Sequence, residues 1–380
     1  MKKHRIENTL KLMREQGLDG LLYASSANFQ YLADTPDTFW QRSSMNNIAG
    51  KFSARTTPEA VFYLNSQGEG YICCIPSLKE KFTSFNNLYV SYLDQMEDTL
   101  SLFIKGMRIG IGFDCHEFLH DTLKAIDNNV EVVDAEELLN DLRVIKDEDE
   151  IRVLIENAQF TDRAVRFVCD HLKAGMTQRE IEQLLMDYGF HHNVPDFAFS
   201  PTCGLKTRHT ELAIEALTFS RDSILVEGTA IAFDVGYVIN GYCSDWGRTV
   251  YFGKAPEFIK NGYKALQTGQ QYMVEQIVPY KTNNSELYDL VLKKVTELGY
   301  GDYLRFQDTG MLGHQIGIDC HEHPMINRST DFILRPGMVF CSEPKMFFQN
   351  ECYMRVEDMI LVTKTGAEFL STFDRNLFEL

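Results

Sequence analysis

The chain has 380 residues, more than one hydrophobic core usually serves, so we expect two domains. Its formal net charge of -17 argues against binding to nucleic acid, because contact with phosphates requires clusters of lysine and arginine that the sequence lacks. No apolar run approaches the length of a membrane-spanning helix and the start lacks a signal-peptide pattern, so we expect a cytoplasmic protein that does not bind membranes.

The first part of the chain alternates helices and strands, which is typical of an α/β domain. Apolar periodicity predicts helices near residues 7–16 and 116–126. Short apolar runs predict strands near 20–23, 60–64, 70–75, 108–113 and 130–133. We therefore place a first domain at residues 1–142 and a second domain at 143–380.

The second domain is expected to repeat one order of elements, two helices followed by paired strands. The first two helices are predicted over 151–172 and 177–190, the latter opened by the capping-box pattern of Thr177 and Glu180. A second pair is predicted over 256–277 and after 283–286, and strand-rich sequence follows it. Because no residue-level repeat is visible, the duplication is predicted for the architecture only.

A hairpin is predicted over residues 233–253, FDVGYVINGYCSDWGRTVYFG, with Asn240-Gly241 at its tip. In this register Asp234 lies opposite Gly247, and Asp245 reaches the same sheet face as Asp234. Two carboxylates so close repel each other unless a cation lies between them, and the opposing glycine leaves room for one. A solvated edge residue is the alternative explanation for either aspartate.

The second half of the chain supplies further candidate ligands. GHQIGIDCHEHP contains His314 and His321, and GMVFCSEP ends an apolar strand with Glu343. MRVEDMILVT places Glu357 inside a strand that otherwise looks buried, where an ionised carboxylate is costly unless it is paired or bound to metal. Arg355 lies on the same face two residues earlier and offers the alternative explanation, a buried ion pair.

These segments, taken in order, resemble the signature of the pita-bread metallopeptidases, which include Xaa-Pro aminopeptidases, prolidases, methionine aminopeptidases and the creatinases. The first domain is similar to the creatinase-type domain of aminopeptidase P and prolidase. The resemblance covers nearly the whole chain. It implies an N-terminal creatinase-type α/β domain followed by a pita-bread α+β catalytic domain with a pseudo-twofold repeat.

The resemblance also implies a set of site residues. Two divalent metal ions are expected, with Mn²⁺ first and Co²⁺, Fe²⁺ or Zn²⁺ as alternatives, because most of the ligands are oxygens. The implied metal ligands are Asp234, Asp245, His314, Glu343 and Glu357. Glu343 is expected to move a proton to the leaving nitrogen, and His209 and His321 are expected to flank the substrate without binding metal.

The implied activity is hydrolysis of Xaa-Pro peptide bonds by a metal-bridging hydroxide, either as a dipeptidase or as an aminopeptidase. The substrate is then a small, proline-containing peptide. A dipeptidase must neutralise the free carboxylate of its substrate, and Arg328 and Arg335 are the candidates for that role. We also expect a homodimer, in which a loop carrying Phe39, Trp40 and Arg42 reaches the partner.

Two departures from the family pattern leave other functions open. Gln315 and Lys345 are bulkier and more polar than the glycines usual at these positions, and both are expected to lie near the pocket while leaving the metal ligands intact. They motivate a hydrolase of non-peptide amides or cyclic metabolites on the same metal site. A catalytically silent binding protein is a third alternative, against which the complete ligand set argues.

Overall fold

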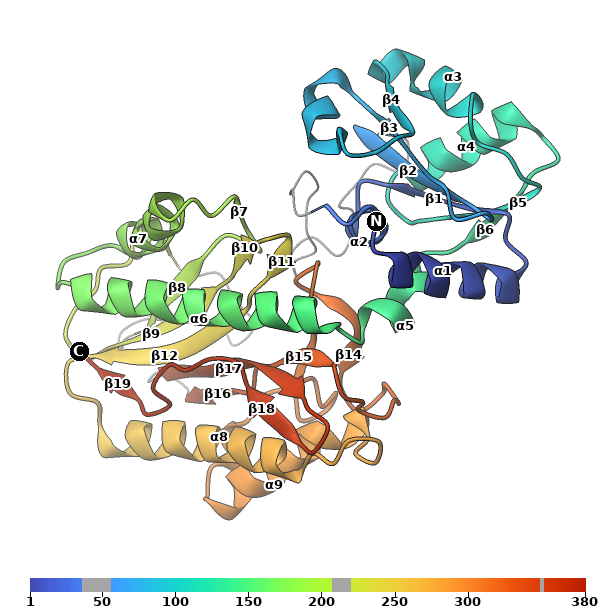
Figure 1. Cartoon of the computed structure of the whole chain (residues 1–380). Coiled ribbons are helices and arrows are strands. Elements are labelled where there is room, and N and C mark those ends of the chain that lie inside the picture. The colour runs from blue at the N-terminus through green and yellow to red at the C-terminus, as the bar shows by residue number, and fades with distance from the viewer. Residues whose placement is uncertain (36–55, 207–219, 349–351) are drawn as a thin grey trace. The chain divides into compact units, whose positions relative to one another are not determined.

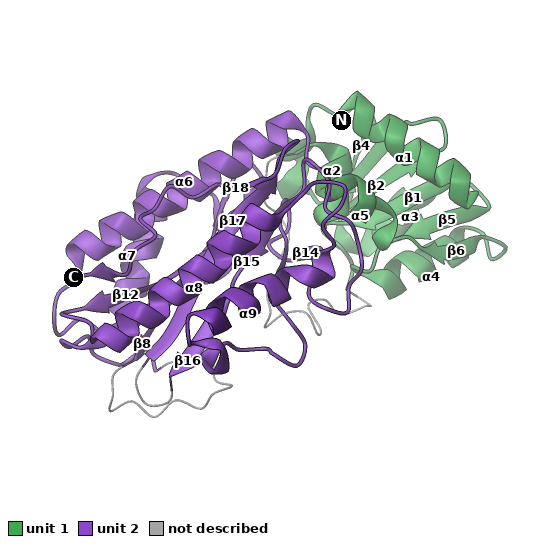
Figure 2. Cartoon of the chain, turned by 90° about the horizontal axis from the view of Figure 1, so that it is seen from below, with its two compact units in different colours: residues 1–143 green, residues 144–380 purple. Residues whose placement is uncertain are grey.

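The computed structural model describes residues 1–35, 56–206, 220–348 and 352–380 of the chain (Figure 1). These residues form two compact units, Met1–Arg143 and Val144–Leu380 (Figure 2). Among the described residues, no helix combines the length and the apolar character needed to cross a membrane.

The first unit is built on a six-stranded sheet with the strand order β4-β3-β2-β1-β5-β6. Strand β1 pairs antiparallel with β2 and parallel with β5, so the sheet is mixed. Its helices and strands are α1 (Lys3–Gln16), β1 (Gly20–Ala24), α2 (Ala27–Ala33), β2 (Ala60–Asn65), β3 (Gly70–Cys74), η1 (Pro76–Phe82), β4 (Leu88–Val90), η2 (Leu93–Gln95), α3 (Met96–Ser101), β5 (Arg108–Ile111), α4 (His116–Ile126), β6 (Glu131–Asp134), η3 (Glu137–Leu139) and α5 (Asn140–Arg143).

Both faces of this sheet are covered by apolar contacts. Leu119 of α4 packs in one buried cluster with Val61 of β2. The next residue of β2, Phe62, points to the opposite face, and its ring lies 5.7 Å from that of Phe29 in α2. The predicted helices and strands of this unit are confirmed, but α1 begins at Lys3 rather than at residue 7, and α2, α3 and β4 were not predicted.

The second unit is organised around a ten-stranded sheet. Its main path runs in the order β14-β13-β15-β17-β12-β9-β8, with β16 and β18 paired to β17 and β19 paired to β12. A smaller sheet has the order β11-β10-β7. The elements are α6 (Glu148–His171), α7 (Gln178–His191), β7 (Asp196–Phe197), β8 (Thr202–Lys206), β9 (Thr229–Val235), β10 (Tyr237–Ile239), β11 (Tyr242–Cys243), β12 (Trp246–Phe252), α8 (Glu257–Gln276), η4 (Asn284–Glu286), α9 (Leu287–Glu297), η5 (Gly301–Tyr303), β13 (Gly313–Gln315), β14 (Glu322–Ile326), β15 (Val339–Ser342), β16 (Lys345–Phe348), β17 (Cys352–Val362), β18 (Ala367–Phe369) and β19 (Phe378–Glu379).

The predicted order of two helices followed by strands occurs twice in this unit, as α6 and α7 and again as α8 and α9. The predicted capping box of Thr177 and Glu180 is confirmed at the start of α7, and Asp147 with Glu150 forms another at the start of α6. Figure 1 shows strands β12 and β17 running between the long helices α6 and α8.

Each pair of helices contributes to its own apolar core against the sheet. Val165 of α6 and Ile181 of α7 are buried together with Phe233 of β9. Leu266 of α8 is buried in another cluster with Ile360 of β17. The two helix layers fix the central strands, so side chains on the other face of these strands are held in defined positions.

Candidate metal centre

The predicted hairpin has the expected register. Asn240 and Gly241 adopt φ angles of 52° and 79°, as the two central residues of the predicted turn require. Ile239 pairs with Tyr242 across the turn, and Asp234 pairs with Gly247. The turn therefore determines which residue faces Asp234 on the neighbouring strand.

Strand β17 adds a third residue to the pair formed by Asp234 and Gly247, so that a row of three residues crosses the sheet. Glu357 pairs with Gly247 on the other side of β12, so Asp234, Gly247 and Glu357 lie side by side across three strands. A Cβ atom at position 247 would lie 2.3 Å from Cδ of Arg355 and 2.7 Å from a carboxylate oxygen of Glu357. The glycine does leave room opposite Asp234, as predicted, and the side chain of Arg355 fills it.

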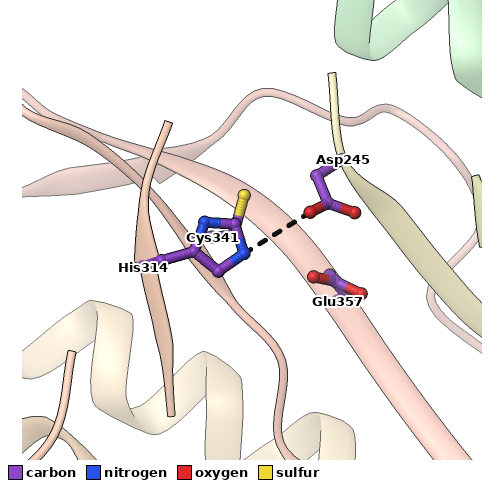
Figure 3. Close-up of side chains that lie close together, drawn as sticks. All are labelled: Asp245, His314, Cys341 and Glu357. Atoms are coloured by element: carbon purple, nitrogen blue, oxygen red, sulfur yellow. Dashed lines mark ion pairs between the residues drawn. The ribbon is translucent and has the colours of Figure 1, made fainter. Parts of the chain in front are cut away.

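Four buried side chains converge beside this row: Asp245, His314, Cys341 and Glu357 (Figure 3). One ligand atom from each lies within 4.8 Å of the others. His314 and Cys341 are paired residues on β13 and β15, Glu357 belongs to β17, and Asp245 lies between β11 and β12. Three of the five predicted metal ligands are thus brought into one cluster.

The orientation of His314 suits a metal ligand. Its Nδ1 lies 3.0 Å from the carbonyl oxygen of Gln315, which can only accept a hydrogen bond, so Nδ1 carries a proton. The other ring nitrogen, Nε2, lies 3.4 Å from Oδ2 of Asp245. Burial lowers the pKa of His314, but Asp245 and Glu343 raise it by more, so the net pKa lies above its ordinary value.

The carboxylates of this cluster fit a cation. Asp245 Oδ1 and Glu357 Oε2 are buried and have no hydrogen-bond partner among the residues that the structure describes. Burial, together with the charges of Asp245 and Glu343, raises the pKa of Glu357 well above its usual range. Leaving such oxygens unpaired costs free energy, and a divalent ion would satisfy both.

The other two predicted ligands lie next to this cluster but are paired with cations of the protein. The guanidinium of Arg355 contacts Asp234, and it also lies 3.7 Å from Glu357 and 3.9 Å from Glu343. The ammonium of Lys345 contacts Glu343. Lys345 lies on β16 and reaches Glu343 directly, a contact that the sequence did not predict. The role of Glu343 as a metal ligand stays a prediction.

These pairs change the acidity of the carboxyl groups. Burial alone would raise the pKa of Glu343, but Lys345, Arg355 and His314 lower it to about 2. Burial raises the pKa of Asp234 above its ordinary value, although Arg355 opposes the shift. Burial lowers the pKa of Lys345 and the Glu343 carboxylate raises it by more, so its ammonium group stays charged.

Of the two histidines predicted to flank the substrate, the structure describes only His321. The ring of His321 lies 4.1 Å from that of His314, and His321 also groups with Asp245 and Cys320. His321 therefore borders the cluster. His209 lies outside the described residues, as does the predicted dimer loop with Phe39, Trp40 and Arg42.

Sequence reasoning missed Cys320 as a neighbour of Asp245. The Sγ atom of Cys320 lies 3.4 Å from Oδ2 of Asp245, and Cys341 belongs to the cluster itself. Burial and the charge of Asp245 raise the pKa of both thiols well above the usual range. The position of Cys320, directly before His321, was the only available signal.

Arg328, one of the two candidates for binding a substrate carboxylate, is engaged elsewhere. Its Nε donates to Oδ1 of Asp289 at 3.0 Å, and its guanidinium lies 4.9 Å from the ring centre of Tyr288. Arg328 therefore forms a partly exposed ion pair with Asp289. Arg335 remains a prediction.

Comparison with known proteins identifies related chains over both units. The profile of the metallopeptidase family M24 matches residues 153–364, and that of the creatinase/prolidase N-terminal domain matches residues 5–145. An Xaa-Pro dipeptidase of Pyrococcus furiosus is 24% identical over 376 residues, which cover 99% of each chain.

Solved structures share the fold over the whole chain. The prolidase of Pyrococcus horikoshii OT3 has a TM-score of 0.80 at 23% identity and covers 99% of this chain and 100% of its own. The X-Pro aminopeptidase of Thermotoga maritima has a TM-score of 0.78 at 20% identity and covers 99% of each. The predicted fold class, a creatinase-type α/β domain followed by an α+β catalytic domain, is confirmed.

Proposed function

Because the chain belongs to metallopeptidase family M24, we propose that it is a metal-dependent hydrolase that cleaves Xaa-Pro peptide bonds in small peptides. The observation that carries this proposal is the buried convergence of Asp245, His314 and Glu357 within the residues that match the family. The relative named Xaa-Pro dipeptidase aligns with 99% of this chain, which supports this substrate class. The name of that relative supports dipeptides, rather than longer peptides, as the substrates that we propose for this chain.

The metal would be held by Asp245, His314 and Glu357, with Asp234 and Glu343 as the remaining predicted ligands. When bound, a divalent ion supplies a Lewis acid and a water molecule of lowered pKa. Carboxylate oxygens outnumber softer donors in this set, which supports Mn²⁺.

The residues of the chain would then handle the substrate and the proton. With its pKa near 2, Glu343 is a carboxylate at neutral pH and can accept a proton from the attacking water and pass it to the leaving nitrogen. His321 borders the cluster and would donate a hydrogen bond to the carbonyl oxygen as negative charge develops on it. We propose the same role for His209.

A substrate panel tests this function. Metal-stripped protein is resupplied with Mn²⁺, Co²⁺ or Zn²⁺ and assayed with Xaa-Pro dipeptides, Xaa-Pro-Yaa tripeptides and proline-free controls. We expect metal-dependent cleavage of the dipeptides. Cleavage of tripeptides instead would indicate an aminopeptidase. Bound metal without cleavage of any peptide would favour the non-peptide amide hydrolase that Gln315 and Lys345 motivate.

Metal removal should also destabilise the folded chain. The buried carboxylates of Asp245 and Glu357 repel each other without a cation, so chelation is expected to lower the thermal midpoint. Metal at about 100 times its dissociation constant should restore about 2.7 kcal/mol of stability. Differential scanning calorimetry measures this shift. The Glu357→Gln variant is the control, since its midpoint should respond much less to metal; an equal response in both proteins would place the ion elsewhere.

We also propose that the protein acts in the cytoplasm as a homodimer. A monomeric mass in solution with full activity would contradict the dimer.

A further inference from the structure

Two cations are buried beside the predicted ligands. Lys345 on β16 pairs directly with Arg355 on β17, and only 8% and 6% of these residues are exposed. Like charges placed opposite each other on neighbouring strands repel, and a buried ammonium group is costly to desolvate. Such an arrangement is stable only where carboxylates neutralise both groups.

The neutralising carboxylates are predicted metal ligands. Lys345 contacts Glu343, and Arg355 contacts Asp234. The carboxylate oxygens that lack a hydrogen-bond partner among the described residues are Oδ1 of Asp245 and Oε2 of Glu357, and the latter lies 3.7 Å from Arg355, beyond hydrogen-bond distance. In one part of the site, the negative charge of the carboxylates is thus already neutralised by cationic side chains. In the other part, the carboxylates can accept a metal ion.

The charges support the same division. Asp234, Asp245, Glu343 and Glu357 contribute four carboxylates, and Lys345 and Arg355 contribute two cations. Two negative charges remain, which is the charge that one divalent ion balances. A second divalent ion would bring an excess of positive charge into a buried site unless Lys345 moved away.

We propose that the centre binds a single divalent metal ion at Asp245, His314 and Glu357, and that the ammonium group of Lys345 takes the place of a second ion beside Glu343 and Asp234. This inference rests on the proposed function for the presence of a metal. It differs from the two-metal arrangement that the resemblance implies, and the difference follows from the presence of Lys345.

Metal content tests the inference. The full chain is stripped of metal, incubated with excess Mn²⁺, separated from free ions and analysed by inductively coupled plasma mass spectrometry. We expect about one Mn²⁺ per wild-type chain. The Lys345→Gly variant should bind about twice as much, whereas Lys345→Arg, which keeps the charge, should match the wild type.

Electron paramagnetic resonance gives an independent readout. Wild type should show the hyperfine-split signal of an isolated Mn²⁺, and Lys345→Gly should show an exchange-coupled pair. About two Mn²⁺ per wild-type chain would overturn the inference while leaving the proposed function standing, even where the variant fails to fold. Wild-type protein that binds no Mn²⁺, Co²⁺ or Zn²⁺ would overturn both.

Discussion

Replacing Asp245 with asparagine is expected to lower kcat/KM by about three orders of magnitude. Asp245 belongs to both groups of candidate ligands, and its Oδ2 lies 3.4 Å from Nε2 of His314. An amide loses the negative charge that holds a divalent ion, and the metal contributes several kcal/mol to stabilising the transition state, at about 1.36 kcal/mol for each tenfold change in rate. Steady-state kinetics with an Xaa-Pro dipeptide measures the loss, and metal analysis of the same sample should show that the ion is gone.

The matched control for this variant is Asp222→Asn. The Asp222 side chain is 85% exposed and pairs only loosely with Arg179, at 3.5 Å. Its kcat/KM and metal content should equal those of the wild type. Full activity and unchanged metal content in Asp245→Asn would contradict the assignment of the centre.

The second large effect is expected for stability, at the ion pair of Arg248 and Asp358. Both side chains are buried, and Arg248 also donates to the carbonyl oxygens of Gly247 and Glu357. Replacing Arg248 with methionine leaves Asp358 with Arg375 as its remaining cationic partner. We expect a loss of about 3–5 kcal/mol in the free energy of unfolding, the usual cost of breaking a buried pair.

Urea unfolding followed by circular dichroism measures this loss. Arg179→Met is the control, because it breaks an exposed pair with Asp222 and should leave the transition unchanged. The double variant Arg248→Met with Asp358→Leu should recover part of the loss, since the buried Asp358 carboxylate is then no longer left with the partly exposed Arg375 as its cationic partner. If Arg248→Met were as stable as Arg179→Met, this would contradict the expected contribution of the buried ion pair to stability. Because Arg248 holds the backbone of Glu357, weaker metal binding should accompany the lower stability.

The features that could be predicted from the sequence are those set by local chemistry. Asn240-Gly241 fixed the register that places Asp234 opposite Gly247, because only certain residues accept the φ angles of that turn. Thr177 with Glu180 predicted a helix start for the same kind of reason. Glu357 stood out because its strand otherwise looked buried, and every residue of β17 is buried.

The features that could not be predicted depend on contacts between distant segments. Lys345 lies opposite Arg355 only because β16 folds back onto β17, and no local pattern specifies that pairing. The sequence therefore suggested that Lys345 lies near the pocket but not that it pairs with Glu343. Cys320 reaches Asp245 across a large separation in the chain for the same reason.

The most direct test of the proposed function is a titration of metal-free protein with Mn²⁺ in which bound metal and hydrolysis of an Xaa-Pro dipeptide are measured on the same samples. Hydrolysis should be absent without metal and should rise in proportion to the metal bound. Hydrolysis that persists in metal-free protein, or saturating metal with no hydrolysis of any Xaa-Pro peptide, would contradict it.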